Sequence, residues 1–244
     1  EKAKAMELSV VAGTQRRHQR EYVDIYKKVA GGMIGEMTGG NVYWNGGKLW
    51  HRDPNAAWSE MEYMIRNWVN WTWLSGDHIV EQHVHNLDVA QWFFGAHPVK
   101  ALGFGSRQRR VTGDQYDNFS VDFVFEDGRH LHSMCRQING TDGGVYERLQ
   151  GQNGSTNCRT SIVDLAGNSL YEYKFPVDAE GKNIGSKPYV QEHIDLVNAI
   201  RTNTPINEAE NVANSTMMAI MGRISAYTGK ETTWEEMMNS DLKL

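Results

Sequence analysis

Residues 76–95 read GDHIVEQHVHNLDVAQWFFG, and this stretch carries the pattern from which the fold of the chain is inferred. Asp77 can cap the start of a helix, because its side-chain oxygen can accept a hydrogen bond from a free backbone N–H of the first turn. Gly95 suits the position after a helix, where a left-handed backbone costs a residue without Cβ little. The stretch is therefore predicted to form one helix.

Two stripes run along this predicted helix, because residues three or four positions apart share a face. A mostly apolar stripe should face the core, and it consists of Val80, Val84, Leu87, Gln91 and Phe94. A second, polar stripe consists of His78, Glu81, His85, Asp88 and Trp92. The amphipathic pattern predicts a helix that packs on a core and presents titratable groups on its other side.

The polar stripe places an imidazole, His85, one helical turn after a carboxylate, Glu81. A carboxylate can orient an imidazole that titrates near neutral pH, and such a pair can transfer protons. We therefore take His85 and Glu81 as candidate catalytic residues; the alternative is a solvated face on which they merely pair. A zinc or manganese site is a further interpretation, because His78, Glu81, His83 and His85 are close in sequence. On an ideal helix His83 points away from the other three, so one ion would need those three alone or a ligand from elsewhere, and no metal is predicted.

Composition narrows the class of protein. The chain has 244 residues, of which 40% are hydrophobic and 23% charged, which is typical of a globular protein with a substantial core. A net charge of −5 without a basic run argues against nucleic-acid binding, and no apolar run reaches the roughly 18 residues of a membrane span. Two isolated cysteines, Cys135 and Cys158, favour a reducing compartment.

Hydrophobic periodicity predicts an α+β fold: a mainly antiparallel open sheet with helices on one face. Residues 118–125 and 129–137 alternate across a short turn, which is a hairpin signal. A buried strand is expected at residues 8–12, and another at 34–45 with an interruption at Gly39–Gly40. Further strands are expected at residues 99–107, 146–150, 160–164 and 170–175, and helices at 18–30, 59–70, 189–202 and 211–228.

Six of the eight tryptophans fall between residues 44 and 73. The flat apolar face of tryptophan suits stacking on sugar rings, but it suits a core or a subunit interface equally well. Asn45, His51 and Arg52 lie among these rings and are candidate contacts to a polyol; the alternative is a plain surface loop. The segment predicts a carbohydrate site only if the rings are accessible.

A nucleotide-binding motif is absent from the sequence. No GxGxxG follows a predicted strand, and Gly103-Phe104-Gly105 lacks the third glycine and lies between strands. The sequence also has no P-loop, no HExxH and no GxSxG. The chain by itself is therefore predicted to have no nucleotide site.

Four segments, taken in order, resemble the glucose-fructose oxidoreductase/inositol dehydrogenase (Gfo/Idh/MocA) family. They are VAGTQRR at residues 11–17, GMIGE at 32–36, HNLD at 85–88 and AIRTNTP at 199–205. The resemblance implies that residues 1–13 are a remnant of a dinucleotide-binding domain. It also implies that residues 14–244 form the substrate-binding and oligomerisation domain. The rest of the nucleotide domain would lie upstream.

In that family an Asp-x-x-x-His pair serves the substrate hydroxyl, and a lysine from the nucleotide domain assists. The histidine matches His85, whereas the acid position holds Glu81, whose extra methylene moves the carboxylate by about one bond length. The resemblance makes His78 and Arg16 substrate-binding candidates, and Arg16 also a cofactor-binding one; a structural salt bridge is the alternative for Arg16. NAD or NADP would be held mainly by the missing domain.

The resemblance thus implies an NAD(P)-dependent oxidoreductase that acts on a sugar or polyol, with His85 as acid/base. Two alternatives stay open. One is a glycoside hydrolase or lyase that oxidises its sugar transiently with bound NAD, and the other is a non-catalytic oligomerisation module for this piece alone. We expect this piece to be inactive alone and to form a homo-oligomer through the open sheet face. A cytoplasmic location is expected, or a periplasmic one if an export signal lies upstream.

Overall fold

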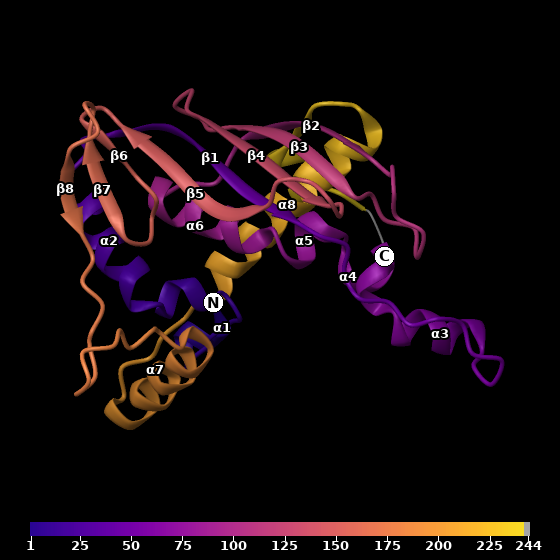
Figure 1. Ribbon diagram of the computed structural model, residues 1–244, viewed down its shortest axis with the longest axis horizontal. Coiled ribbons are helices and arrows are strands. Elements are labelled where there is room, and N and C mark those ends of the chain that lie inside the picture. The colour runs from indigo at the N-terminus through magenta and orange to yellow at the C-terminus, as the bar shows by residue number, and fades with distance from the viewer. Residues whose placement is uncertain (242–244) are drawn as a thin grey trace. The chain divides into compact units, whose positions relative to one another are not determined.

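The computed structural model describes residues 1–241 (Figure 1). The chain divides into two compact units. Unit 1 holds residues 1–39, 88–95 and 147–214, and unit 2 holds residues 40–87, 96–146 and the chain from 215 onward. Within the described residues the strands number nine and are mostly antiparallel, so the predicted α+β class is confirmed.

Unit 2 contains the hairpin that the alternating sequence predicts. The strand β3 (Asn118–Val124) pairs antiparallel with β4 (His130–Gln137), from Asn118 opposite Arg136 to Val124 opposite His130. Every second residue on both strands is buried, which is the pattern of a sheet with one covered face. The strand order in this unit is β1 (Met37–Gly46), β4, β3, β2 (Lys100–Ser106) and β9 (Thr232–Thr233).

A helix packs closely on this part of the sheet because small residues line the contact. The helix is α8 (Ala209–Thr228), and a Cβ placed on Gly222 would lie 2.8 Å from the Phe123 ring. On β2, a Cβ on Gly103 would lie 3.1 Å from the backbone of the same helix. The Ser225 hydroxyl also accepts a hydrogen bond from the Gly103 N–H at 2.8 Å. The sequence thus keeps α8 at backbone contact distance from β2.

Unit 1 contains a meander of short strands. Its strand order is β8 (Ser169–Glu172), β7 (Ser161–Asp164), β6 (Gly154–Thr156) and β5 (Gly144–Gly151), with each neighbouring pair antiparallel. The sequence did not predict β6 or β9, which have three and two residues. Strands this short are below the length at which alternation can be recognised.

Of the remaining helices, those within residues 20–30, 60–70 and 188–202 match expected segments, whereas the short ones at 15–18, 72–75 and 234–238 were not predicted. Unit 1 holds α1 (Lys2–Ala5), η1 (Gln15–His18), α2 (Arg20–Ala30) and α7 (Pro188–Thr202). Unit 2 holds α3 (Glu60–Arg66), η2 (Trp68–Asn70), α4 (Thr72–Ser75), α5 (His78–Glu81) and α9 (Trp234–Met238). Their starts follow capping chemistry: the Ser59 hydroxyl accepts from the Glu62 N–H, and Thr233 and Glu236 form a capping box.

Two strand predictions are wrong. Residues 8–12 form only a single parallel bridge between Val10 and Asn207, and Leu8 is 51% exposed, so no buried strand exists there. Of the other N–H groups of the run, that of Leu8 bonds to the Ala3 carbonyl and that of Ala12 to the Glu208 side chain, both outside any strand, so no ladder forms. The predicted interruption at Gly39–Gly40 is also wrong, because β1 runs through both glycines.

The single helix predicted for residues 77–95 is wrong as well. It is broken at Gln82–His83 into α5 and α6 (Val84–Phe94). The His83 N–H donates to the His78 carbonyl at 3.2 Å, an i to i−5 bond that inserts one residue, as in a π-bulge. The break turns the buried His83 ring to the Ser133 hydroxyl at 2.7 Å. The caps at Asp77 and Gly95 are confirmed, by the bond from the His78 N–H and by a φ of 68°.

Candidate functional site

The site predicted around His85 lies in unit 2, where α5 and the first turn of α6 follow the Trp-rich segment. His78, the first residue of α5, is 2% exposed. Its Nε2 lies 3.3 Å from the Trp44 carbonyl, and the Gln137 amide donates to its Nδ1 at 3.0 Å. Burial lowers the pKa of His78 to about 4. The ring is therefore neutral at physiological pH, with its proton on Nε2 and both nitrogens occupied.

Trp44 connects this buried histidine to the proposed acid/base. The Trp44 and His85 rings lie 6.0 Å apart between centroids, at an interplanar angle of 30°. His85 as a residue is half-buried, and its Nδ1 atom is buried. The hydrogen bond from His78 holds the Trp44 backbone in place and so fixes one wall beside the His85 ring. We call His78, Gln137, Trp44, His85 and Glu81 the His85 cluster.

Glu81 is the half-buried carboxyl of this cluster. Its Oε2 is buried and has no hydrogen-bond partner among residues 1–241. Burial raises the pKa of Glu81, because the charged form loses hydration that no other group replaces. A raised pKa extends the pH range over which a carboxyl holds a proton that it can donate. The predicted catalytic roles of Glu81 and His85 stay predictions.

Asp77 stabilises the start of α5, and the sequence identified it only as a cap. Its backbone has φ 82° and ψ 163°, a region that non-glycine residues rarely adopt and that costs about 1–3 kcal/mol. The buried carboxylate accepts from the Tyr227 hydroxyl and from the His78 N–H, both at 2.6 Å. Burial raises the pKa of Asp77 to about 6. These two bonds hold His78 in the conformation that the cluster requires.

Replacing Tyr227 with phenylalanine should therefore destabilise unit 2. The Tyr227→Phe variant leaves one oxygen of a buried carboxylate without its donor, which typically costs about 1–3 kcal/mol. Urea denaturation at pH 7 measures the loss. Tyr171→Phe is the matched control, because that hydroxyl donates at 2.7 Å to Asp24, which is only half-buried, so water can replace the lost donor. Equal losses in the two variants would contradict the role given to Asp77.

The predicted polyol contacts lie in the same unit. Asn45 is half-buried near the end of β1, and its amide nitrogen lies 3.9 Å from the Met134 sulfur. His51 and Arg52 lie on an exposed loop, which is the surface-loop alternative. Asn67 holds that loop by accepting from the Arg52 N–H at 2.7 Å. Three tryptophans of the segment have accessible rings, with exposures of 47%, 42% and 51%: Trp50, Trp68 and Trp73.

Arg16 belongs to unit 1 and is committed to an ion pair with Glu147, which is 1% exposed. The Tyr22 hydroxyl donates to the other oxygen of the same carboxylate at 3.1 Å. This geometry matches the structural salt bridge that the sequence left open as the alternative. Contact between Arg16 and a substrate or cofactor stays a prediction.

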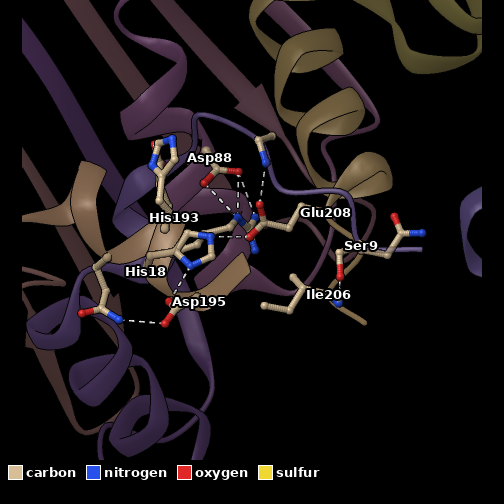
Figure 2. A network of polar contacts seen from close by, with 12 residues as sticks. Ser9, His18, Asp88, His193, Asp195, Ile206 and Glu208 are labelled. Atoms are coloured by element: carbon tan, nitrogen blue, oxygen red, sulfur yellow. Dashed lines mark hydrogen bonds and ion pairs between the residues drawn. The ribbon is translucent and has the colours of Figure 1, made fainter. Parts of the chain in front are cut away.

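A second polar network, which the sequence did not predict, surrounds His18 in unit 1 (Figure 2). His18 Nδ1 lies 2.7 Å from an Asp195 oxygen, and Nε2 lies 2.9 Å from a Glu208 oxygen. The other Glu208 oxygen accepts from the Ala12 N–H at 2.8 Å. The two carboxylates, Glu208 first, raise the pKa of His18 to about 9. Partners 177 and 190 positions away leave no local signal in the sequence.

This raised pKa predicts a loss of stability at alkaline pH. The folded-state pKa of His18 exceeds the unfolded value of 6.5, so its contribution is fully present below pH 6.5 and disappears as the pH rises through 9. Because Asp195 is partly exposed, we expect a contribution of about 2 kcal/mol. Urea denaturation from pH 6 to 10 measures it. His18→Gln should remove this pH dependence, and an unchanged profile would refute the assignment.

A resident metal or a nucleotide finds no fitting site in the described part of the chain. Among residues 1–241 no three His, Cys, Asp or Glu side chains are grouped so that they could hold a metal ion. No glycine-rich turn joins a strand to a helix there in the way that a pyrophosphate requires. None of the helices in that range is both long and apolar enough to cross a membrane.

Comparisons with known proteins agree with the fold. A family model described as GFO/IDH/MocA C-terminal domain matches residues 22–156. A putative myo-inositol dehydrogenase from Sinorhizobium meliloti 1021 is similar with a TM-score of 0.65 at 15% identity, over 95% of this chain and 67% of that one. A probable dehydrogenase from Thermotoga maritima gives 0.66 at 16%, over 96% and 67%.

A levoglucosan dehydrogenase in complex with NADH and levoglucosan gives a TM-score of 0.66 at 16% identity, over 93% of this chain and 66% of that one. The chain therefore spans about two thirds of the length of the solved structures that it matches. At these identities the likeness concerns the fold. No curated protein sequence matches the chain.

Proposed function

Because the chain belongs to the GFO/IDH/MocA C-terminal domain family, we propose that it is the substrate-binding part of an NAD(P)-dependent oxidoreductase acting on a sugar or polyol. The observation that carries the proposal is the half-buried His85 imidazole beside the Trp44 indole, in the same unit as a half-buried carboxyl, Glu81, whose Oε2 has no hydrogen-bond partner among residues 1–241. Such a group can take the proton of a hydroxyl while the indole packs against a sugar ring. Similar folds include a levoglucosan dehydrogenase solved with NADH.

Each residue of the cluster has a separate role in this proposal. His85 accepts the proton of the reacting hydroxyl. Burial raises the pKa of Glu81, and in this proposal Glu81 passes that proton on or balances the charge that His85 gains. His78 does not contact the substrate, because its ring is 2% exposed and both nitrogens are occupied. It is a positioning residue that acts through Trp44. The proposal thus replaces the substrate-binding role that was expected of His78 with a positioning role.

The nucleotide would be bound by a domain outside this chain, since the described residues do not fit a pyrophosphate. When bound, a nicotinamide supplies the acceptor for a hydride. This chain contributes the proton acceptor and the walls of the sugar site. Arg16 is kept as a candidate contact to both the substrate and the cofactor, although its ion pair with Glu147 favours a structural role.

Calorimetric titration tests whether the cofactor is bound by a separate domain and not by this chain. NAD⁺ and NADH are titrated into this chain and into a version extended upstream by about one domain, roughly 100–150 residues. Binding only by the extended protein, followed by NADH formation with a sugar or polyol, supports the proposal. Binding by neither protein would overturn it, and turnover by the 244-residue chain alone would refute its expected inactivity.

A second candidate function rests on Glu81. A half-buried carboxyl with a raised pKa is equipped to protonate a leaving oxygen, which is the acid role in cleaving or eliminating a glycosidic bond. In this version the cofactor oxidises the sugar transiently and returns the hydride. Release of a free sugar from a glycoside without net NADH accumulation would favour it over a dehydrogenase.

We also propose that the chain forms a homo-oligomer through the open face of the sheet in unit 2. On β2, Leu102 is 42% exposed and Phe104 is 70% exposed, on the side away from the buried Ala101. Apolar side chains adjacent on an open sheet favour contact with a second copy. Light scattering should give a multiple of 27.7 kDa. A monomeric mass would contradict this, and Phe104→Ser should weaken the association.

A further inference from the structure

A cavity of about 180 Å³ opens in unit 2 beside the His85 cluster. No Asp or Glu lies among the described residues that line it. Its wall includes three cations and three amides, namely Lys48, Arg109, Arg110, Asn70, Gln137 and Asn139. A concave surface with several positive charges and no acid attracts an anion.

Arg110 is held rigidly in this wall. One terminal nitrogen donates to the Asn70 side-chain oxygen at 2.9 Å, and the other donates to the Gln137 side-chain oxygen. Its Nε is buried and has no hydrogen-bond partner in the described part of the chain. A guanidinium fixed by two amides is already arranged for binding, so little side-chain freedom is lost when an anion arrives.

Two carboxylates that interact with the Arg110 charge, Asp77 and Asp117, do not line the cavity. Asp117 accepts from the backbone N–H groups of residues 108–110, at distances of 2.6 to 3.1 Å. Asp77 accepts from Tyr227 and from the His78 N–H. Asp117 therefore shapes the loop that carries Arg109 and Arg110 through backbone hydrogen bonds, and it forms no side-chain ion pair with either arginine within residues 1–241.

The two remaining cations are available. Lys48 and Arg109 are exposed, and neither side chain forms an ion pair with any of residues 1–241. Asn70 also donates from its side chain to the Trp50 carbonyl at 3.2 Å, which ties the backbone of the Trp-rich segment to the wall. A positive cavity attached to a segment with exposed tryptophans matches a sugar that carries a negative group.

We propose that this cavity binds an anionic substituent of the sugar substrate, a carboxylate or a phosphate or sulfate ester. The inference rests on the proposed function and narrows its substrate class to acidic sugars. Gln137 joins the cavity to the reacting end of the site, because the same side chain lines the cavity and donates to His78, which bonds to Trp44 beside His85. The anion then fixes which hydroxyl of the sugar reaches His85.

Calorimetry on the 244-residue chain tests the cavity directly. The probes are glucuronate, glucose 6-phosphate and glucose 6-sulfate, with neutral glucose as the reference. We expect at least one acidic sugar to bind about tenfold or more tightly than glucose, with an affinity that falls as salt increases. The preferred probe identifies the carboxylate, phosphate or sulfate source. Inorganic phosphate and acetate alone show how much the anion contributes without the sugar.

The Lys48→Glu/Arg109→Glu variant should lose this preference about tenfold or more. Its matched control is Lys182→Glu/Lys230→Glu, which changes the net charge equally at two exposed lysines outside the cavity. Equal binding of glucose and all acidic probes, or unchanged acidic binding in the cavity variant, overturns the inference. If the extended protein oxidises neutral sugars but the cavity binds no acidic sugar, the proposed function stands and the inference about the cavity fails. If acidic sugars bind but the extended protein oxidises none of them, the proposed function fails and the inference about the cavity stands.

Discussion

Replacing His85 with alanine should lower kcat on the best sugar or polyol by two to four orders of magnitude. A positioned general acid/base contributes a factor of this size, because without it the hydroxyl must lose its proton to water. The assay uses the extended protein that binds the cofactor and follows NADH absorbance. His85 is half-buried at the start of α6, so the truncation should leave the fold intact. A rate within a few-fold of the parent would refute the assignment.

The control for this variant is His130→Ala. That imidazole lies on β4 in the same unit, pairs with Asp122 at 2.9 Å and is 58% exposed, so its loss should leave kcat unchanged. Glu81→Gln separates orientation from proton transfer, because glutamine keeps the shape but cannot titrate. If Glu81 exchanges protons with His85, the Glu81→Gln variant should move the pH–rate profile as well as lower kcat. A lower rate with an unmoved profile would assign Glu81 a structural role.

Local patterns predicted most of the fold, and long-range pairing accounts for the differences. The β3–β4 hairpin was predictable because alternation records which face each residue buries, and the burial of Phe119, Val121 and Phe123 follows that pattern. The break in the central helix was not predictable. It is accompanied by a hydrogen bond between His83 and Ser133, fifty residues later, and a helical wheel considers only the spacing of residues within the helix.

In the candidate site, too, local patterns predicted some features, and others depend on contacts between residues far apart in the sequence. The pattern of His85 and Glu81 was visible as a spacing, and the structure brings Trp44 to His85 as a neighbour that no spacing indicated. Asp77 was recognised for its cap, whereas its strained backbone and its bond to Tyr227 depend on residues 150 positions apart. The polar stripe was expected to face solvent in the alternative interpretation. Burial of His78 and Asp88 excludes that interpretation for these two residues.

Asp88 gives the second large expected effect, this time on stability. The Arg17 guanidinium binds its carboxylate with two nitrogens at 2.9 to 3.1 Å, and the Asp88 side chain is 1% exposed (Figure 2). The same guanidinium lies 5.3 Å from the centroid of the Trp92 ring. Arg17→Met keeps an apolar stem against Trp92 but leaves the buried carboxylate without its counter-charge. Breaking a buried pair in this way costs about 3–5 kcal/mol.

Urea denaturation of Arg17→Met and of the double variant Arg17→Met/Asp88→Leu separates two causes of the lost stability. One is the loss of attraction between the two charges, and the other is the desolvation cost of a buried carboxylate left without its counter-charge. If the cost comes from stranding a desolvated charge, the double variant should recover most of the stability, because neither charge then remains buried. The matched control is Arg66→Met, which breaks an ion pair with Glu62 whose side chains are 47% and 40% exposed and should cost under about 0.5 kcal/mol. A double variant as unstable as the single one would show instead that the pair itself holds residues 17 and 88 together.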